Sequence, residues 1–401
     1  MSEQQEPPHA GIPPAAPGAA LAGLRVLELG TLIAGPFAGR LLADFGADVI
    51  KIEEPGQGDP LRTWGMMLPE GSLWSFVQNR GKRCVALDLH RPEDRRAVSR
   101  LAQEADVLIE NFRPGRMEQW GLGPEQLAAS APGLVYVRIS GFGQSGPLSG
   151  QPGFGSVAEA MGGMRYLTGP ADSPPTPVGL SLGDSIAAMY AVFGALTALR
   201  ARDRTGRGQV VDVALSEAVL SMLEAVLPEY GRFGAVRERT GNLAHNSAPT
   251  NAYLCGDGRW VVIGANADNL FAALMTLMGR ADLRDDPSLA SNLGRVARAA
   301  ELDGVIAKWA AGRASDEVVV ALRTAGVPAG PVNSIADIAA EEQFRERGMV
   351  LEVESRAGPI LMPGVMPRLS ETPGSVRWAG PAVGEHTAEV MEQLDLGLAQ
   401  H

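Results

Sequence analysis

Short runs of β-branched residues alternate with longer segments of helical periodicity in the first half of the chain. Residues 25–29 (RVLEL) and 48–53 (DVIKIE) have the length and composition of buried strands, and Pro36 suits the first turn of a helix between them. The same patterns predict strands at residues 83–89, 106–112 and 134–139, and a charged surface helix at 91–104. Strands that alternate with helices indicate a parallel sheet with crossover helices, so we expect an α/β, Rossmann-like fold.

A long apolar segment follows at residues 181–200. It is apolar or alanine on nearly every face, which predicts a helix buried on most of its sides. Residues 208–215 predict a further strand, and Ser216 is expected to cap a helix that ends near residue 227.

The pattern changes near residue 230, where Gly, Arg and Asn interrupt any period. Asp257-Gly258 lies between two β-branched runs and indicates a hairpin. Helical patterns follow at residues 269–278 and 299–325. Together these elements predict a smaller α+β domain.

The 401 residues exceed what one hydrophobic core usually supports, so we expect two domains. The predicted segments are a disordered tail at residues 1–20, a large Rossmann-like domain at 21–225, a small α+β domain at 226–330 and a C-terminal return segment at 331–401. The tail is rich in Pro and Ala. The return segment contains two strand-like pieces and a last helix, and is expected to pack back on the large domain.

Composition and charge indicate which binding partners and which cellular compartment to expect. The formal net charge of −11 argues against a broad nucleic-acid surface, because such surfaces neutralise phosphates with cations. Every apolar run of about 18 residues is interrupted by charge or glycine, so we expect no membrane partner. The N-terminus does not resemble a signal peptide. Cys84 and Cys255 are too few for a disulfide framework and indicate buried thiols in a cytoplasmic protein.

The loop after the first predicted strand does not fit a dinucleotide. The segment contains Gly30, Gly35 and Pro36, and its glycines do not have the spacing of a pyrophosphate-binding turn. Glu53 ends the second strand, where an acid that binds ribose would lie, but it lacks those glycines beside it. NAD binding is therefore disfavoured.

Seven segments in order resemble the class III CoA-transferase family, which includes formyl-CoA transferase, carnitine CoA-transferase and alpha-methylacyl-CoA racemase. They lie at residues 24–36, 46–53, 79–83, 105–115, 179–184, 204–209 and 384–387. Each match alone is weak, but together they cover nearly the whole chain. The resemblance implies a homodimer of two interlocked, ring-shaped chains, each with a large Rossmann-like domain and a small domain.

Asp184 matches the family's catalytic aspartate. The resemblance implies that Asp184 attacks an acyl-CoA thioester and then carries coenzyme A as an aspartyl thioester. Coenzyme A and acyl-CoA are then substrates, and we expect no tightly bound cofactor and no metal. Local sequence alone favours a different role, in which Asp184 caps a helix. If it opens that helix, the first N–H groups are expected to keep it ionised.

Two groups of residues match, or lie beside, positions that the family uses along coenzyme A. The first group lies at the ends of predicted strands or in the loops after them: Leu32, Leu87, Asn111, Phe112, Arg113 and Arg116. The second group is cationic: Arg62, Lys82 and Arg83. Each cation taken alone is as well explained by solvated surface charge.

The acyl pocket departs from that of formyl-CoA transferase, so oxalate is disfavoured as an acceptor. The residues expected near the acyl group are Ile33, Phe154, Arg165, His245 and Asn246. The segment around Phe154 and Arg165 is more similar to that of transferases acting on succinate, malate or citramalate. Succinyl-CoA is therefore the expected donor, with Arg165 a candidate for the distal carboxylate.

Two other functions remain open at this point. A 2-methylacyl-CoA racemase needs a base on each face of the α-carbon, and the position of its histidine is Phe154 here. His245 is the remaining histidine with a plausible place in a site. A non-catalytic acyl-CoA-binding protein would share the fold and bind the same ligand without exchange.

Overall fold

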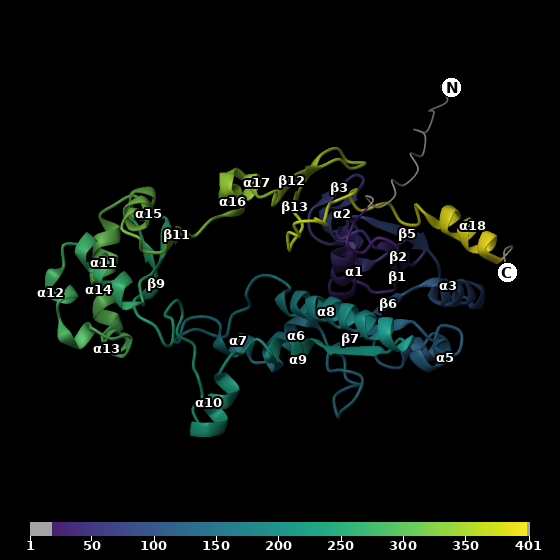
Figure 1. The fold of residues 1–401 in the computed structure, drawn as a ribbon, viewed down its shortest axis with the longest axis horizontal. Coiled ribbons are helices and arrows are strands. Elements are labelled where there is room, and N and C mark those ends of the chain that lie inside the picture. The colour runs from purple at the N-terminus through teal and green to yellow at the C-terminus, as the bar shows by residue number, and fades with distance from the viewer. Residues whose placement is uncertain (1–17, 399–401) are drawn as a thin grey trace. The chain divides into compact units, whose positions relative to one another are not determined.

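The computed structural model describes residues 18–398. The predicted disordered tail lies almost entirely outside the described residues. The chain divides into two compact units. Figure 1 shows the chain coloured by residue number. The large unit comprises the described residues of Met1–Met164, Val178–Leu227 and Gln343–His401, and the small unit comprises Arg165–Pro177 and Pro228–Glu342.

A six-stranded parallel sheet forms the centre of the large unit. Its strands, in spatial order, are β5 (Lys82–Ala86), β2 (Asp48–Glu53), β1 (Arg25–Glu28), β6 (Val107–Glu110), β7 (Val135–Ser140) and β8 (Val210–Ala214). Counting only these strands, the order is 3-2-1-4-5-6, the doubly wound Rossmann arrangement. The predicted α/β class with a parallel sheet is confirmed.

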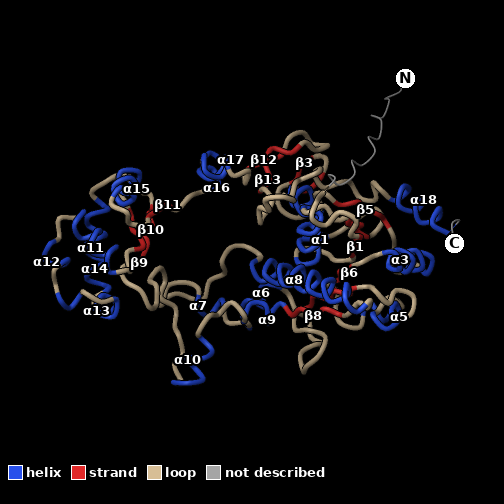
Figure 2. The backbone as a smooth tube through the Cα atoms, in the orientation of Figure 1, coloured by secondary structure: helices blue, strands red, loops and turns tan. Residues whose placement is uncertain are grey.

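Alternate residues of the strands belong to two separate hydrophobic cores, because successive side chains of a strand point to opposite faces of the sheet. Val26, Val107 and Val135 pack with α1 (Ala34–Asp44) and α8 (Leu182–Thr205). On the other face, Leu27, Leu108 and Tyr136 share a core with residues of α3, α5 and α18. These helices span Pro92–Glu104, Pro124–Ala128 and Thr387–Leu398. Figure 2 shows helices around the strands of this sheet.

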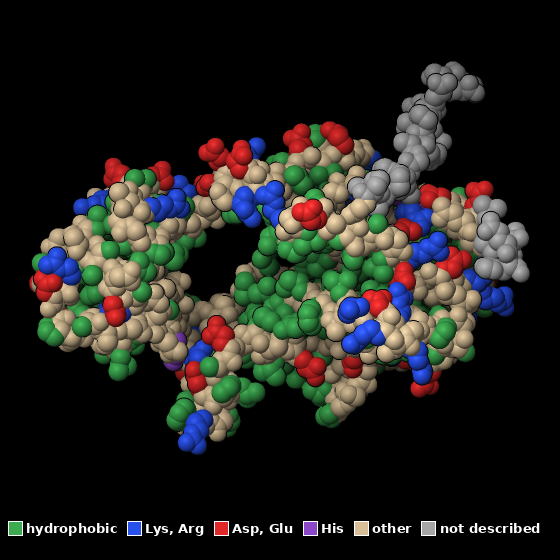
Figure 3. Space-filling model, in the orientation of Figure 1, with side chains coloured by type: hydrophobic (Ala, Val, Ile, Leu, Met, Phe, Trp, Pro, Cys, Tyr) green, Lys and Arg blue, Asp and Glu red, His purple; other side chains and the backbone are tan. Residues whose placement is uncertain are grey.

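Helix α8 departs from the prediction that most of its sides are buried. Its alanines pack inward, whereas Met189 is 51% and Phe193 67% exposed. Figure 3 shows hydrophobic side chains gathered in this part of the large unit. By length and composition alone α8 would be able to cross a bilayer, a property shared by core helices of soluble proteins.

Shorter elements complete the large unit. They are η1 (Pro60–Thr63), β3 (Met67–Leu68), β4 (Gly71–Ser72), α2 (Leu73–Gln78), α4 (Arg116–Gln119), α6 (Gly155–Met161), α9 (Leu215–Leu220), β12 (Val350–Val353) and β13 (Ile360–Pro363). The predicted helix from Ser216 to residue 227 is wrong: Ala214 is the N-cap of α9, and the left-handed backbone of Glu224 (φ 48°) separates α9 from α10 (Val226–Phe233).

The small unit contains an antiparallel sheet, β11 (Ala329–Pro331), β10 (Trp260–Gly264) and β9 (Thr250–Leu254). The hairpin predicted at Asp257-Gly258 is confirmed, with Gly258 at φ 79°. The unit's other elements are α11 (Asp268–Leu277), α12 (Ala281–Arg284), η2 (Pro287–Leu289), α13 (Asn292–Ala297), α14 (Ala299–Ala311), α15 (Ser315–Thr324) and α16 (Ile335–Ala340). Helices α7 (Met164–Leu167) and α17 (Glu342–Glu346) lie at unit boundaries.

Residues 165–177, assigned to the large domain by sequence, belong to the small unit in the structure. Hydrogen bonds explain this placement. Tyr166 donates its hydroxyl proton to Glu238 at 2.7 Å, and the Gly241 N–H donates to the Gly169 carbonyl at 3.1 Å.

Candidate active site

A cavity of about 190 Å³ opens at the carboxyl ends of the large unit's parallel strands. Its lining includes residues that follow four of these strands: Thr31 and Leu32 after β1, Asn111 to Pro114 after β6, Ser140 and Gly141 at the end of β7, and Leu215 after β8. The sheet order reverses between β1 and β6, and such switch points bind ligands in open α/β sheets.

Asp184 lines this cavity from the first turn of α8. The N-cap position belongs to Ser181, so Asp184 is not the helix cap that local sequence favoured. Gly155, the first residue of α6, also lines the cavity and lies against Asp184. A Cβ at position 155 would overlap Asp184 Oδ2, so only glycine leaves that oxygen uncovered.

The Asp184 carboxyl is less acidic than an ordinary aspartate. Burial, and secondly the charge of Glu159, raise its pKa from 3.8 to about 6, against a smaller lowering by its own backbone N–H. The expectation that helix N–H groups dominate its ionisation is therefore wrong. The carboxylate still predominates near pH 7, and a carboxylate of raised pKa is a better nucleophile than one of ordinary acidity.

The loop after β1 adopts a strained backbone at the cavity. Leu32 has φ 63°, a left-handed conformation that is costly for a residue with a Cβ. Its N–H donates to Asp59 Oδ1 at 2.9 Å. Asn111 holds the preceding residue, Thr31, by accepting its N–H at 2.8 Å and donating to its carbonyl at 2.9 Å. Asn111, expected along coenzyme A, thus also shapes this loop.

A buried lysine also holds this loop in place. Lys51 Nζ lies 2.9 Å from Asp59 Oδ2, 3.0 Å from Glu28 Oε1 and 2.7 Å from the Gly30 carbonyl. Burial alone would lower the pKa of Lys51, but Asp59 and Glu28 raise it above its ordinary value. The lysine therefore stays protonated and donates to the loop.

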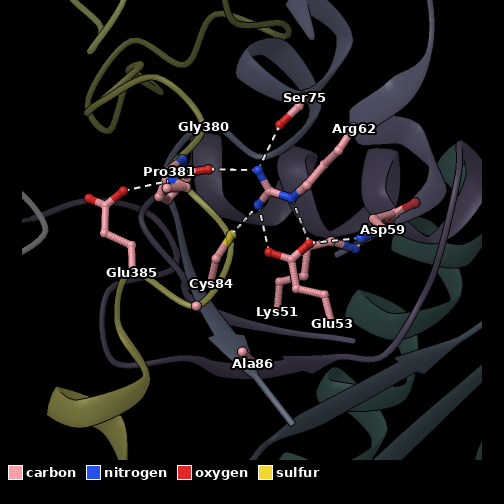
Figure 4. Close-up of polar contacts among 12 residues, drawn as sticks. Lys51, Glu53, Asp59, Arg62, Ser75, Cys84, Ala86, Gly380, Pro381 and Glu385 are labelled. Carbon is pink, nitrogen blue, oxygen red and sulfur yellow. Dashed lines mark hydrogen bonds and ion pairs between the residues drawn. The ribbon is translucent and has the colours of Figure 1, made fainter. Parts of the chain in front are cut away.

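Three cations expected at coenzyme A phosphates face inward instead. Arg62 is paired with Glu53, and also donates to Ser75 Oγ at 3.1 Å and the Pro381 carbonyl at 2.9 Å, as Figure 4 shows. Lys82 is fully buried against Glu28 at 2.7 Å. Its burial lowers its pKa to about 8.

Arg83, the third of these cations, is paired with Asp48 and Glu389. The phosphate role expected of Arg62, Lys82 and Arg83 is therefore corrected, because carboxylate or carbonyl partners occupy the donors of these little-exposed side chains.

The remaining residues expected along coenzyme A differ in their accessibility. Arg113 lines the cavity and is exposed, as is Arg116, whose guanidinium lies 5.5 Å from the Trp120 ring centroid. Phe112 lines the cavity and meets Trp120 edge to face. Leu87 is only 6% exposed and belongs to the core around α3. Arg113 and Arg116 are thus the expected cations that stay open to solvent.

The residues expected near the acyl group fall into both units. Ile33 and Phe154 line the cavity beside Asp184. Arg165, His245 and Asn246 belong to the small unit, where the Asn246 carbonyl accepts from Asn292 at 2.8 Å. Their role at the acyl group stays a prediction.

Two polar residues that shape the site, Asp59 and Glu159, were not predicted from the sequence. Glu159 lies four residues after Gly155, which is about one helical turn, so both residues share a face of α6. Because Gly155 lies against Asp184, this spacing is the signal that could have placed Glu159 beside Asp184. Asp59 precedes Pro60, a pattern typical of a helix cap, but the pattern does not indicate that the same carboxylate also accepts from Leu32.

Comparisons with known proteins agree with this geometry. The sequence profile of CoA-transferase family III matches residues 21–387. The chain is 48% identical over 379 residues to succinyl-CoA–D-citramalate CoA-transferase of Chloroflexus aurantiacus, covering 94% of each chain. It is 35% identical to succinate–glutarate CoA-transferase of Agrobacterium fabrum, covering 94% of this chain and 96% of that one. The crystal structure of a CaiB/BaiF family protein from Brucella suis superposes with a TM-score of 0.85 at 36% identity, covering 94% of this chain and 100% of that one.

Proposed function

Because this chain belongs to CoA-transferase family III and is a CoA-transferase, we propose that it moves coenzyme A from succinyl-CoA to a second carboxylic acid through a covalent intermediate on Asp184. The observation that carries this proposal is the Asp184 carboxyl itself. It is partly exposed in a cavity at the carboxyl ends of the strands, and its pKa is raised to about 6.

The first half of the reaction loads coenzyme A onto the enzyme. An Asp184 oxygen attacks the thioester carbonyl, the carbon–sulfur bond breaks, and a mixed anhydride and the coenzyme A thiolate form. The thiolate then attacks the aspartyl carbonyl and releases the donor acid as its carboxylate. Asp184 is left as a neutral thioester of coenzyme A.

The second half repeats these steps in reverse with a new acid. The acceptor carboxylate attacks the aspartyl carbonyl, forming an anhydride and freeing the thiolate. The thiolate attacks the acceptor's carbonyl, which produces a new acyl-CoA and restores the Asp184 carboxylate. One thioester replaces another, so the exchange needs no ATP.

The lining of the cavity supports a dicarboxylic substrate. Relatives that share a third to a half of the sequence are named for succinate with citramalate, malate or glutarate. Thr31, Ser140, Ser149 and Gln151 line the same cavity as Asp184, and their hydroxyl and amide groups are of the kind that can hydrogen-bond a second carboxylate. The exposed cations Arg113 and Arg116 are the proposed partners of coenzyme A phosphates.

We propose in addition that the protein forms a homodimer and is cytoplasmic. Exposed apolar side chains on α8, including Met189 and Phe193, favour a homodimer in which this face is covered. Two buried free thiols, Cys84 and Cys255, are typical of a cytoplasmic protein.

Racemisation is the less favoured reaction at this site. It requires a second acid–base group beside Asp184. Among the described residues that line the cavity, no histidine is present, and the position expected for one holds Phe154.

An exchange assay with purified protein tests the proposal. Succinyl-CoA is mixed with citramalate, malate or glutarate, and new acyl-CoA is detected by mass spectrometry. Wild type is expected to form product, and Asp184→Asn to lose at least about a thousandfold in kcat because the nucleophile is gone. The matched control is Asp203→Asn, an exposed position near the other end of α8, which should keep its activity.

Asp184→Asn with wild-type activity would refute the role of Asp184. If no dicarboxylic acyl-CoA turns over while another acyl-CoA does, only the substrate proposal fails.

A further inference from the structure

A second carboxyl group is buried beside the nucleophile. Glu159, on α6, is 4% exposed and accepts the backbone N–H of Gly183 at 3.2 Å. Gly183 immediately precedes Asp184 on α8, and α6 packs against α8. Burying a carboxyl group is costly, so its place beside the reacting residue calls for a reason.

The packing of α6 on α8 makes this approach possible. A Cβ at Gly183 would lie 3.2 Å from Glu159 Cγ and 3.3 Å from the Gly155 carbonyl, which is tighter than normal contact. One turn earlier on α6, Gly155 lies against the Asp184 carboxylate. Two glycines, one on each helix, thus let Glu159 and the Asp184 carboxyl share one small region.

Charged side chains on the other neighbouring elements are exposed or engaged with other partners. On α9, Glu217 is exposed, and on the loop after β6, Arg113 is exposed at the cavity. On α1, Arg40 is engaged with Asp44 and Gln78. Glu159 is the one neighbouring charge that raises the pKa of Asp184, after burial itself.

We propose, on the basis of the aspartyl intermediate proposed above, that Glu159 is a positioning residue that favours acylation of Asp184. Two carboxylates in a poorly solvated region repel each other. Anhydride or thioester formation removes the charge on Asp184 and with it the repulsion. The Glu159 carboxylate therefore raises the energy of the free enzyme relative to the loaded enzyme, which speeds loading. Its hydrogen bond to Gly183 fixes the first turn of α8 at the same time.

Glu159→Gln tests this role because glutamine keeps the length and the oxygen that accepts from Gly183, and removes the charge. After mixing with succinyl-CoA and succinate at fixed ratio, the fraction of enzyme carrying coenzyme A is measured by intact-protein mass spectrometry. The ratio of loaded to free enzyme is expected to fall about tenfold, as for removal of one pKa unit of interaction. In the pH profile of kcat/KM, the acid limb should move to lower pH, because one cause that raises the pKa of Asp184 is removed.

Matched variants separate charge from structure. Glu159→Asp keeps the charge and should keep the wild-type acid limb, and Glu217→Gln removes an exposed charge on α9 and should change neither readout. Should Glu159→Gln fold poorly, Glu159→Met, also uncharged and of similar length, replaces it.

An uncharged variant with the wild-type loaded fraction and acid limb overturns the inference. If wild type itself never carries coenzyme A, the proposed function fails instead, so the two failures are distinguishable.

Discussion

Asp184 experiences opposing influences at the start of α8. Its own backbone N–H stabilises the carboxylate, while burial and Glu159 destabilise it, and the balance raises its pKa to about 6. The sequence was sufficient to select Asp184 through its family resemblance. It was insufficient to predict the acidity, because Glu159 and Gly155 approach only when α6 packs on α8.

This pKa shift predicts how stability depends on pH. A carboxyl with a raised pKa in the folded protein binds protons more tightly than in the unfolded chain, so its ionisation opposes folding. Its contribution to stability is fully present below about 3.8 and is lost as pH rises to about 6. We expect Asp184→Asn to become more stable relative to wild type across that window and to keep a constant advantage above it. Urea unfolding at several pH values measures the difference, and a difference independent of pH would contradict the account.

At the scale of elements, the strands of the parallel sheet were predictable because each is a short β-branched run between turns. The exposed face of α8 was not, since alanine and large apolar residues give the same pattern whether solvent or a partner covers them. The break between α9 and α10 was also missed: the left-handed residue in it is Glu224, a residue type that usually continues a helix.

The loop after β1 lines the cavity and is held in place by Asp59. Asp59 accepts from Leu32 and Leu61 and pairs with buried Lys51, so Asp59→Ala leaves a buried lysine with one carboxylate fewer. We expect a loss of about 3–5 kcal/mol in the free energy of unfolding. The KM for acyl-CoA should rise in addition, because Leu32 then leaves its left-handed conformation.

Denaturant unfolding and steady-state kinetics measure the two effects of Asp59→Ala. The exposed control Asp203→Ala should stay within about 0.5 kcal/mol of wild type. A stable Asp59→Ala protein with unchanged KM would show that the loop keeps its shape without this carboxylate.

Over the whole molecule, several of the cations that sequence reasoning assigned to coenzyme A stabilise the large unit internally. Lysine and arginine are seldom fully buried, so surface or ligand roles were the natural interpretation. Their partners, such as Glu28 for Lys82 and Glu53 for Arg62, lie on other elements and come beside them only in the folded protein. The two-unit organisation was readable from the change in pattern near residue 230, but the membership of residues 165–177 was not.

The proposed homodimer makes a prediction at the same scale. Phe193 is 67% exposed on the apolar face of α8, and Phe193→Glu would place a charge within a covered interface. Light scattering with size-exclusion chromatography should give a dimer for wild type and a smaller species for the variant. Leu293→Glu, at a residue 81% exposed in the small unit, is the control and should stay dimeric. A wild-type monomer would contradict the proposal.

The most direct test of covalent transfer is the mass of the protein after it meets succinyl-CoA without an acceptor. We predict a species heavier by coenzyme A less one water. Hydroxylamine should release the coenzyme A and leave a hydroxamate that peptide sequencing locates at Asp184. An adduct on another residue, or unmodified protein in a preparation that still catalyses exchange, would contradict the account.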